Sequence, residues 1–239
     1  MRVEFNQIEK RYDSKVALSI PAWNLESGEL LGLVGSNGAG KTTFLRLLLD
    51  LLRPDQGSIR INGRALEADN SWRAVTGSFL DRSFLVEYLT IPEYLEFVGA
   101  AFGISKKETY QKLEAFEGFL PISRVDSKRL LRDLSTGNAK KVGILAALFV
   151  SPDFVILDEP FANLDPPSQI RLKEILIRTG KENHTTMIIS SHDLGHVTEV
   201  CDRITLLSQG KIIRDIETSK ETLAELNTFF STDVVDSAT

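Results

Sequence analysis

The chain contains very little cysteine. Cys201 is the single cysteine among 239 residues, which excludes an internal disulfide and any metal site built from several cysteine side chains. Sparse cysteine is also typical of a reducing compartment. We interpret Cys201 as a small buried apolar residue.

Long apolar runs are missing as well. The longest one, residues 142–150, includes a glycine and falls far short of the about 20 residues that a helix needs to span a bilayer. The amino-terminal segment MRVEFNQIEK lacks the apolar core of a secretory signal. We therefore expect a soluble, cytoplasmic protein that reaches the inner face of the cell membrane only through a partner.

Charge of one sign is not concentrated anywhere along the chain. The 33 acidic and 28 basic residues give a net charge of -5, and like charges form no long block. Domains that bind phosphate backbones usually carry a basic patch or stripe. We therefore expect no nucleic-acid partner.

What is present suffices for one large α/β domain with a modest inserted lobe, because 239 residues with 42% hydrophobic content can bury a sizeable core. Alternating apolar residues at 3–5 and 16–20 predict two short strands of an antiparallel sheet. An apolar strand at 30–34 then enters a glycine-rich loop, and a helix at 43–52 ends before Pro54. Further patterns predict strands at 58–61, 154–157 and 186–190, helices at 140–150 and 168–178, and a hairpin over 204–213.

Helices replace this pattern between residues 90 and 120. Thr90 with Glu93, and Ser105 with Glu108, have the spacing of capping boxes. Strands that alternate with helices imply a mostly parallel sheet, interrupted here by a helical insertion. The tail beyond Ser231 has little to bury and is predicted to be loose.

A glycine-rich motif follows the strand at 30–34 and opens the next helix. Residues 35–43 read GSNGAGKTT and match the phosphate-binding P-loop pattern in its required strand-to-helix context. The backbone N–H groups and the positive end of the helix would face the β- and γ-phosphates, while Lys41 adds a charge and Thr42 a ligand for Mg²⁺. The predicted nucleotide-binding residues are Gly35, Ser36, Asn37, Gly38, Ala39, Gly40, Lys41, Thr42 and Thr43.

Polar residues follow two of the other predicted strands. Ligands bind at the carboxyl edge of an open parallel sheet, so Asp158 and Glu159, after the strand at 154–157, are expected near the P-loop. We assign Asp158 to Mg²⁺ and Glu159 to orienting and deprotonating the attacking water. His192 can hydrogen-bond a γ-phosphate or that water. The other two histidines, His184 and His196, are interpreted as ordinary surface or helix residues.

Residues 134–138 read LSTGN and lie shortly before the two carboxylates. With the P-loop and these carboxylates in this order, the segment resembles the signature motif of ATP-binding cassette (ABC) nucleotide-binding domains, and the likeness covers nearly the whole chain. The resemblance implies a RecA-like P-loop NTPase core, mostly parallel, with an N-terminal antiparallel β subdomain and an inserted α-helical subdomain. It also implies a head-to-tail dimer, in which this segment of one subunit closes over the γ-phosphate held by another. The signature residues are Leu134, Ser135, Thr136, Gly137 and Asn138.

Other positions match the family with varying fidelity. Tyr12 corresponds to the aromatic residue that stacks on adenine, and Asp165 to the loop that communicates across the dimer. Thr136 and Asn138 replace the usual glycine and glutamine. Asp81 stands where the family usually has a glutamine that touches Mg²⁺, so it is either a metal contact through a water or an ordinary loop aspartate.

The resemblance implies an ATPase that uses ATP and Mg²⁺, forms a homodimer or heterodimer of nucleotide-binding domains, and drives export through separate integral membrane permease subunits. Residues 79–104 resemble this region in bacterial exporter ATPases. We expect a single domain, with a nucleotide-binding core at 1–85 and 151–215, a helical subdomain at 86–150 and a tail at 216–239.

Three other functions remain open: a soluble cassette ATPase of iron–sulfur assembly, a translation- or repair-associated cassette protein, and a catalytically silent regulatory module. The translation type normally carries two cassettes and a basic linker. We further expect residues 81–120 to dock on the membrane subunit, with packing onto the insertion's own helices as the alternative. The docking residues would form an apolar cluster of Phe84, Leu85, Val86, Tyr88 and Leu89.

Overall fold

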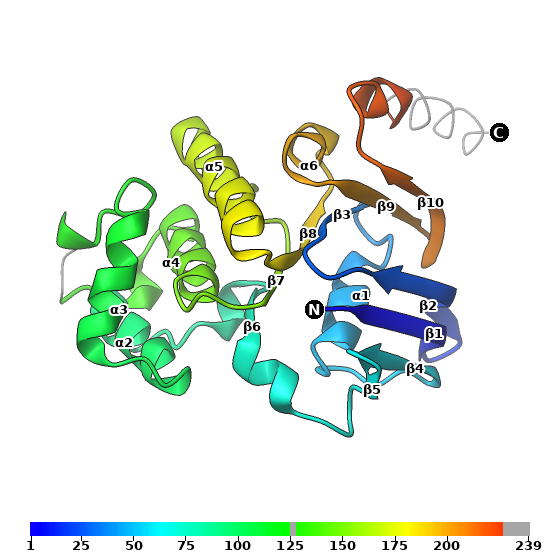
Figure 1. The fold of residues 1–239 in the computed structure, drawn as a ribbon, viewed down its shortest axis with the longest axis horizontal. Helices are drawn as coiled ribbons and strands as arrows, with labels where there is room; N and C mark the ends of the chain where they lie inside the picture. Colours follow the sequence, from blue (N-terminus) through cyan, green and yellow to red (C-terminus); the bar gives the residue numbers. More distant parts are fainter. Residues whose placement is uncertain (125–127, 227–239) are drawn as a thin grey trace.

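The computed structural model describes residues 1–124 and 128–226 (Figure 1). The tail beyond Ser231 that was predicted to be loose lies outside the described residues. Two sheets, one antiparallel and one mostly parallel, are combined with helices. This arrangement confirms the predicted α/β class with its antiparallel and parallel parts.

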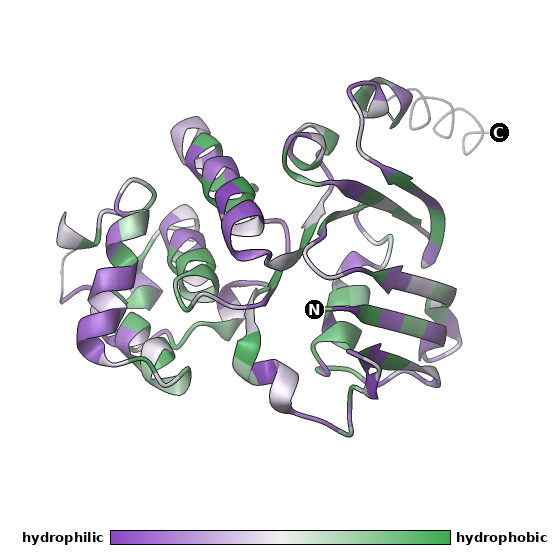
Figure 2. Cartoon of the chain, viewed as in Figure 1, coloured by the Kyte–Doolittle hydropathy of each residue, from purple (hydrophilic) through white to green (hydrophobic). Residues whose placement is uncertain are grey.

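The antiparallel sheet has the strand order β2-β1-β4-β5. Its strands are β1 (Val3–Tyr12), β2 (Lys15–Leu25), β4 (Gln56–Ile61) and β5 (Arg64–Ala65). Apolar and polar residues alternate along β1 and β2 (Figure 2). The apolar face packs on α1 (Lys41–Leu48), where the ring of Phe44 lies 4.5 Å from that of Phe5 and 5.0 Å from that of Trp23.

The mostly parallel sheet has the strand order β10-β9-β3-β8-β7-β6. Its strands are β3 (Leu30–Val34), β6 (Thr76–Phe79), β7 (Phe154–Leu157), β8 (Thr186–Ser191), β9 (Arg203–Ser208) and β10 (Lys211–Glu217). Neighbouring strands from β9 to β6 are parallel, and β10 pairs antiparallel with β9. Because β3 lies between β8 and β9, the loop that follows it opens at the carboxyl edge of the sheet, beside the ends of its neighbours.

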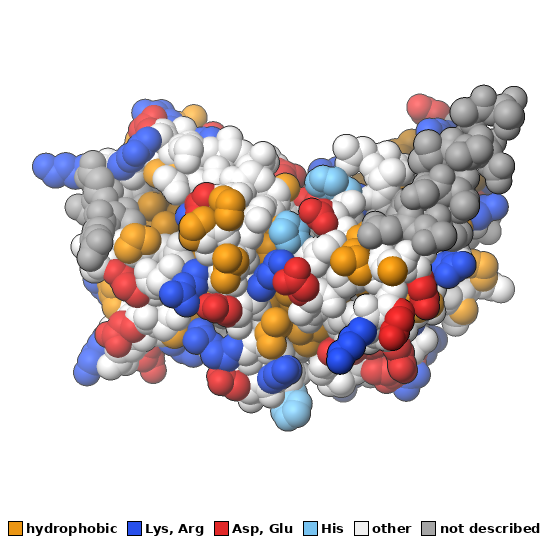
Figure 3. Space-filling model, turned by 90° about the horizontal axis from the view of Figure 1, so that it is seen from above, with side chains coloured by type: hydrophobic (Ala, Val, Ile, Leu, Met, Phe, Trp, Pro, Cys, Tyr) orange, Lys and Arg blue, Asp and Glu red, His pale blue; other side chains and the backbone are white. Residues whose placement is uncertain are grey.

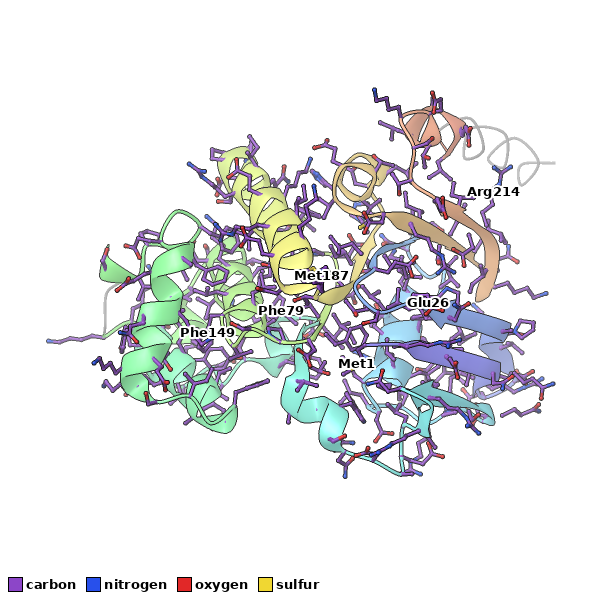
Figure 4. The ribbon with its side chains drawn as sticks, viewed as in Figure 1. Met1, Glu26, Phe79, Phe149, Met187 and Arg214 are labelled. Atoms are coloured by element: carbon purple, nitrogen blue, oxygen red, sulfur yellow. The ribbon has the colours of Figure 1, made fainter. Side chains whose placement is uncertain are left out.

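Three helices, α2 (Ile91–Ala101), α3 (Lys106–Leu113) and α4 (Thr136–Leu148), gather at one end of the molecule (Figure 1). Both predicted capping boxes are confirmed, at Thr90 with Glu93 and at Ser105 with Glu108. The division of the chain into a core and a helical subdomain stays a prediction. One continuous apolar cluster contains residues of both parts, among them Phe79 and Phe149 (Figure 4).

A glycine allows α4 to lie directly on the edge strand β6. A Cβ atom added at Gly77 would lie 1.9 Å from the carbonyl oxygen of Ala147, a distance that requires the backbone to move. The strand β6 was not predicted, because its four residues are mostly small or polar and alone give no clear period. Its pairing with β7 and its contact with α4 determine its structure.

Several predicted boundaries are wrong by a few residues. Helix α1 ends at Leu48 rather than at residue 52, since Asp50 takes a left-handed backbone conformation with φ 55°. Helix α4 begins at Thr136, four residues early, because the Ser135 side chain caps it. Helix α5 (Pro166–Asn183) is longer than predicted at both ends, and the short helix α6 (Leu194–Val200) was not predicted.

The surface and interior agree with the composition. Figure 3 shows one face, on which acidic, basic and apolar side chains are interspersed. Cys201 is buried as predicted, and burial raises the pKa of its thiol. Leu85 is only 6% exposed and packs in the apolar core, which corrects its assignment to an exposed cluster. Over residues 1–124 and 128–226, we find no helix with the length and apolar character to cross a membrane.

Candidate active site

The loop between β3 and α1 holds a buried lysine at the carboxyl edge of the parallel sheet. Gly40 has φ 110°, a left-handed value that favours glycine. Gly35 packs so closely that an added Cβ would lie 2.4 Å from the Leu207 carbonyl oxygen. Lys41 is 6% exposed, and its ammonium group donates to the Gly35 carbonyl at 2.6 Å. The glycines therefore let the backbone wrap around the start of α1.

Asp158 follows β7 directly and faces the first turn of α1. The Thr42 hydroxyl donates to Asp158 Oδ2 at 2.9 Å. The Ser190 hydroxyl, from β8, donates to the other carboxylate oxygen. Two oxygen ligands of the kind that Mg²⁺ prefers, on Thr42 and Asp158, thus lie side by side.

Glu159 has an unusual backbone conformation. Its φ is 48°, in the left-handed region that residues other than glycine rarely adopt. The Glu159 N–H donates to Ser190 Oγ at 2.9 Å, and its carbonyl oxygen accepts from Lys140 Nζ at 2.7 Å. Strand β8 and helix α4 therefore both hold this residue in place.

The Glu159 carboxylate lies between two of the predicted site residues. Its Oε2 atom is 2.8 Å from His192 Nδ1. Its Oε1 atom is 3.3 Å from Lys41 Nζ, although the angle is not that of a hydrogen bond, and among the described residues this oxygen has no hydrogen-bond partner. Chain segments that are far apart in sequence thus converge at one carboxylate.

A cavity of about 680 Å³, within the usual size range of small-ligand sites, opens beside Lys41 and Glu159. His192 is not among the residues that line it and lines an adjoining pocket with Gly35 and Ser36 instead. Tyr12 is 46% exposed and lines this cavity together with the P-loop and both carboxylates. Gln209 and Gly210, in the turn between β9 and β10, also line it and were not predicted. Their signal in the sequence was only a hairpin turn.

Asp81 is not among the residues that line the cavity. It caps the short 3₁₀ helix η2 (Arg82–Phe84), where its carboxylate accepts the Ser83 N–H at 2.7 Å. The other carboxylate oxygen lies 4.0 Å from Arg46 of α1. The metal role of Asp81 therefore stays a prediction that this geometry does not favour.

The signature segment, residues 134–138, lies apart from the cavity. Ser135 Oγ accepts the Asn138 N–H at 3.3 Å and so caps α4. Ser135, Thr136 and Asn138 are exposed, Leu134 is buried, and none of the segment lines the cavity. Within one chain, the predicted signature and the P-loop do not form a common site.

Helix α4 is nevertheless tied to the loop that follows the carboxylates. A Cβ added at Gly137 would lie 2.8 Å from the Asn163 carbonyl oxygen. The Lys141 ammonium lies 3.1 Å from Asp165 Oδ2. The hydrogen bonds that Ser168 and Lys141 donate lower the pKa of Asp165 to about 2. The start of α4 and the loop 159–165 therefore form one unit.

Two residues that hold the site together were missed by the sequence analysis. Ser190 orients both carboxylate residues, and Lys140 anchors the Glu159 carbonyl. Burial lowers the pKa of Lys140, while the charges of Glu159 and Asp158 oppose this shift. The sequence carried only a weak signal for Lys140, its place one helical turn after Gly137.

The parallel sheet, the P-loop at the end of β3 and the paired groups after β7 and β8 define a P-loop NTPase of the cassette type. A family model described as ABC transporter matches residues 18–162, which is more than half of the chain. The chain therefore belongs to the ABC transporter ATP-binding family.

Known proteins agree with this assignment. An uncharacterized ABC transporter ATP-binding protein of Synechocystis sp. is 32% identical over 207 residues, which are 86% of this chain and 57% of that protein. The chain thus spans little more than half the length of this relative. The bacitracin transport ATP-binding protein BcrA of Bacillus licheniformis is 30% identical over 90% of this chain and 69% of its own length. A solved structure of an ATP binding subunit of an ABC transporter has a TM-score of 0.82 at 26% identity, covering 95% of this chain and 94% of that one.

Proposed function

We propose that this chain binds and hydrolyses ATP and drives export through separate membrane subunits by ATP-dependent dimerisation. The observation that carries the proposal is that Lys41 and His192 both lie against the Glu159 carboxylate, beside the P-loop. A charge for phosphate, a base for water and a group that orients the base are the parts that phosphoryl transfer to water requires.

In this proposal ATP occupies the 680 Å³ cavity. The P-loop N–H groups and the positive end of α1 hold the β- and γ-phosphates. Tyr12 stacks on the base, because its ring is half exposed at the cavity wall. The Lys41 ammonium, already positioned by the Gly35 carbonyl, donates to phosphate oxygens.

The site also fits Mg²⁺. This ion usually keeps several waters and binds one or two protein carboxylates together with substrate phosphates. The Thr42 hydroxyl and the Asp158 carboxylate, 2.9 Å apart, supply hard oxygen donors at the phosphate end of the cavity. When bound there, Mg²⁺ would neutralise charge that develops on the phosphates.

Glu159 acts as the base. Water attacks the γ-phosphorus, the bond to the β–γ bridging oxygen breaks, and the Glu159 carboxylate accepts the proton of the water. Glu159 lines the cavity, where its carboxylate can accept from that water once the side chain turns its buried Oε1 atom toward it. His192, 2.8 Å from Oε2, keeps the carboxylate oriented.

The same proposal assigns the signature segment to the site of a second subunit. Ser135 and Gly137 lie at the start of a helix, where N–H groups and the helix dipole favour an anion. Since the segment does not line the cavity of its own chain, a head-to-tail dimer is the arrangement that gives it a phosphate to contact. Asp165, held by Lys141 and Ser168, would then lie next to that contact.

The membrane subunit would dock on an apolar groove of about 490 Å³. The groove is bounded by Leu51 and Trp72 on one part of the chain and by Phe84 and Phe102 on another. Phe84, Val86 and Tyr88 are 46%, 41% and 75% exposed. Exposed apolar groups of this kind favour an interface. The name of the B. licheniformis relative, which refers to bacitracin transport, supports a transport role here.

The test of ATPase chemistry is Glu159→Gln, which preserves the shape of the site and removes the base. We expect ATP affinity within about twofold of the parent chain and a loss of turnover of about 100-fold or more. Steady-state phosphate release and equilibrium ATP binding would be measured together. Hydrolysis near the parent rate would refute the assignment of Glu159.

A further inference from the structure

Arg82, in η2, connects the segment predicted to dock with the entrance to the signature segment. Its guanidinium group donates to the carbonyl oxygens of Arg132 at 2.6 Å, Leu134 at 3.3 Å and Leu131 at 3.4 Å. Its Nε atom also lies 3.2 Å from a carboxylate oxygen of Glu87. One side chain thus bridges positions about fifty residues apart in the chain.

Backbone hydrogen bonds run beside this side chain and join the same two segments. The Leu131 N–H donates to the Leu89 carbonyl at 2.8 Å, and the Arg132 N–H to the Glu87 carbonyl at 3.1 Å. Thr90 and Leu130 form an isolated antiparallel bridge. Backbone hydrogen bonds and one isolated bridge therefore join residues 87–90 to 130–132, and Arg82 holds the stretch from there to α4.

That stretch leads directly into Ser135. After Leu134 the chain turns from an extended conformation into the helix, and the Ser135 cap is exposed. The donor groups of a guanidinium are fixed in one plane, so three carbonyl contacts restrict the direction in which this turn leaves the loop. Bonds from a charged donor are also stronger than neutral ones.

We propose that Arg82 is a positioning residue that sets the orientation of the signature segment toward the phosphate of a partner subunit. The inference rests on the proposed dimeric site and adds a residue to it. Arg82 does not line the cavity and acts through the carbonyls of Leu131, Arg132 and Leu134. Movement of η2 on docking would thereby reach Ser135 without passing through the P-loop.

The test uses the 239-residue chain with Glu159→Gln, so that ATP is bound and not hydrolysed. Arg82→Met keeps most of the side-chain volume and removes every donor, and we expect the ATP-dependent dimer to weaken about tenfold. Arg82→Lys keeps the charge but not the planar fork, and should give an intermediate loss. Monomer ATP affinity and the thermal midpoint should stay near the parent values.

Arg129→Met is the matched control. Arg129 also donates to a carbonyl of this loop, that of Asp133, but only from four residues away, without bridging to η2. Amide exchange of residues 131–138 in the ATP-free monomer supplies a second measurement, and Arg82→Met should accelerate it more than the control does.

Each outcome decides between specific accounts. If Arg82→Met dimerises and exchanges like Arg129→Met, the positioning role is wrong. If monomer ATP affinity, thermal midpoint and dimer affinity all fall together, Arg82 maintains the fold in general and the positioning role is again wrong. If the Glu159→Gln parent itself stays monomeric with ATP bound, the proposed dimeric site fails. The exchange measurement then still tests whether Arg82 restrains residues 131–134.

Discussion

The P-loop and the signature segment are both starts of helices, yet the P-loop lines the 680 Å³ cavity of its own chain and the signature segment does not. Lys41 at the P-loop is 6% exposed and is held by the Gly35 carbonyl and the nearby Glu159 carboxylate. Ser135 at the signature segment is exposed, and its side chain accepts a hydrogen bond from the Asn138 N–H of its own helix.

This contrast indicates that one chain alone forms the P-loop site, whereas the signature segment lacks a phosphate to contact within its own chain. A buried ammonium group is costly unless it is paired, so the P-loop lysine is positioned before any phosphate arrives. The start of the signature helix exposes its polar groups to solvent, which costs little free energy. Its position is fixed by contacts within its own chain: Arg82 binds the preceding loop, and Lys140 and Lys141 bind the loop 159–165. We therefore expect the monomer to bind ATP and the dimer to be needed for its hydrolysis.

The largest effect on ATP binding should follow from changing the P-loop site. Lys41→Ala removes a buried charge that would contact phosphate before hydrolysis, and we expect ATP affinity to fall about 100-fold. Equilibrium binding of a fluorescent ATP analogue measures this. Lys112→Ala, remote from the cavity, serves as the control. An unchanged ATP affinity of Lys41→Ala would contradict the claim that the P-loop site is already formed in the monomer.

Gly77→Ala should loosen the attachment of the signature helix to the sheet. The added Cβ collides with the Ala147 carbonyl, so the free energy of unfolding should fall by about 1–3 kcal/mol. Gly118→Ala, where the new Cβ would lie 3.9 Å from Arg171 Nε, should have little effect. Denaturant unfolding of both variants measures the difference, and equal stability would mean that α4 does not pack on β6 as described.

Changing the predicted docking residues should leave the P-loop site and the signature segment intact. Phe84 and Tyr88 are 46% and 75% exposed, so replacing both by serine should alter stability by less than about 0.5 kcal/mol. Basal ATPase should also stay the same, while recovery with the membrane fraction of the source cells should fall. If the double variant unfolds, these side chains belong to the core of the insertion; if recovery is unchanged, docking uses another surface.

The smallest effect concerns the Asp165 carboxylate, which accepts hydrogen bonds from Ser168 and also pairs with Lys141 of α4. The Asp165 pKa is lowered from 3.8 to about 2, so its stabilising contribution is full above about 3.8 and is lost as the pH falls toward 2. The thermal midpoint of Asp165→Asn should therefore lie below that of the parent at pH 5 and approach it near pH 2. A gap that widens on acidification would contradict the sign of this coupling.

Sequence reasoning located the parts of the site that depend on local chain chemistry. The P-loop glycines, the carboxylates after β7 and both capping boxes are set by residues within a few positions of one another, and so they were predictable. The edge strand β6 and the supporting residues Ser190, Lys140 and Arg82 were not. Their roles come from contacts with segments about twenty to eighty residues away, which no local period encodes.

Asp81 illustrates the same limit from the other side. Its place in the motif order suggested a metal contact, but the neighbouring Ser83 N–H offers its carboxylate a local bond at 2.7 Å. A short polar side chain that can bond its own backbone usually does so. The metal contact therefore stays a prediction, and the observed bond is the one expected of the alternative, an ordinary loop aspartate.

The most direct test of the account is the oligomeric state of Glu159→Gln with ATP, measured by multi-angle light scattering. The account predicts a monomer without nucleotide and a dimer with ATP. It also predicts that adding Ser135→Arg restores the monomer while ATP stays bound, because the larger side chain lies where the partner's phosphate must enter. A Glu159→Gln chain that remains monomeric at high concentration with ATP demonstrably bound, or a Ser135→Arg variant that dimerises equally well, would contradict it.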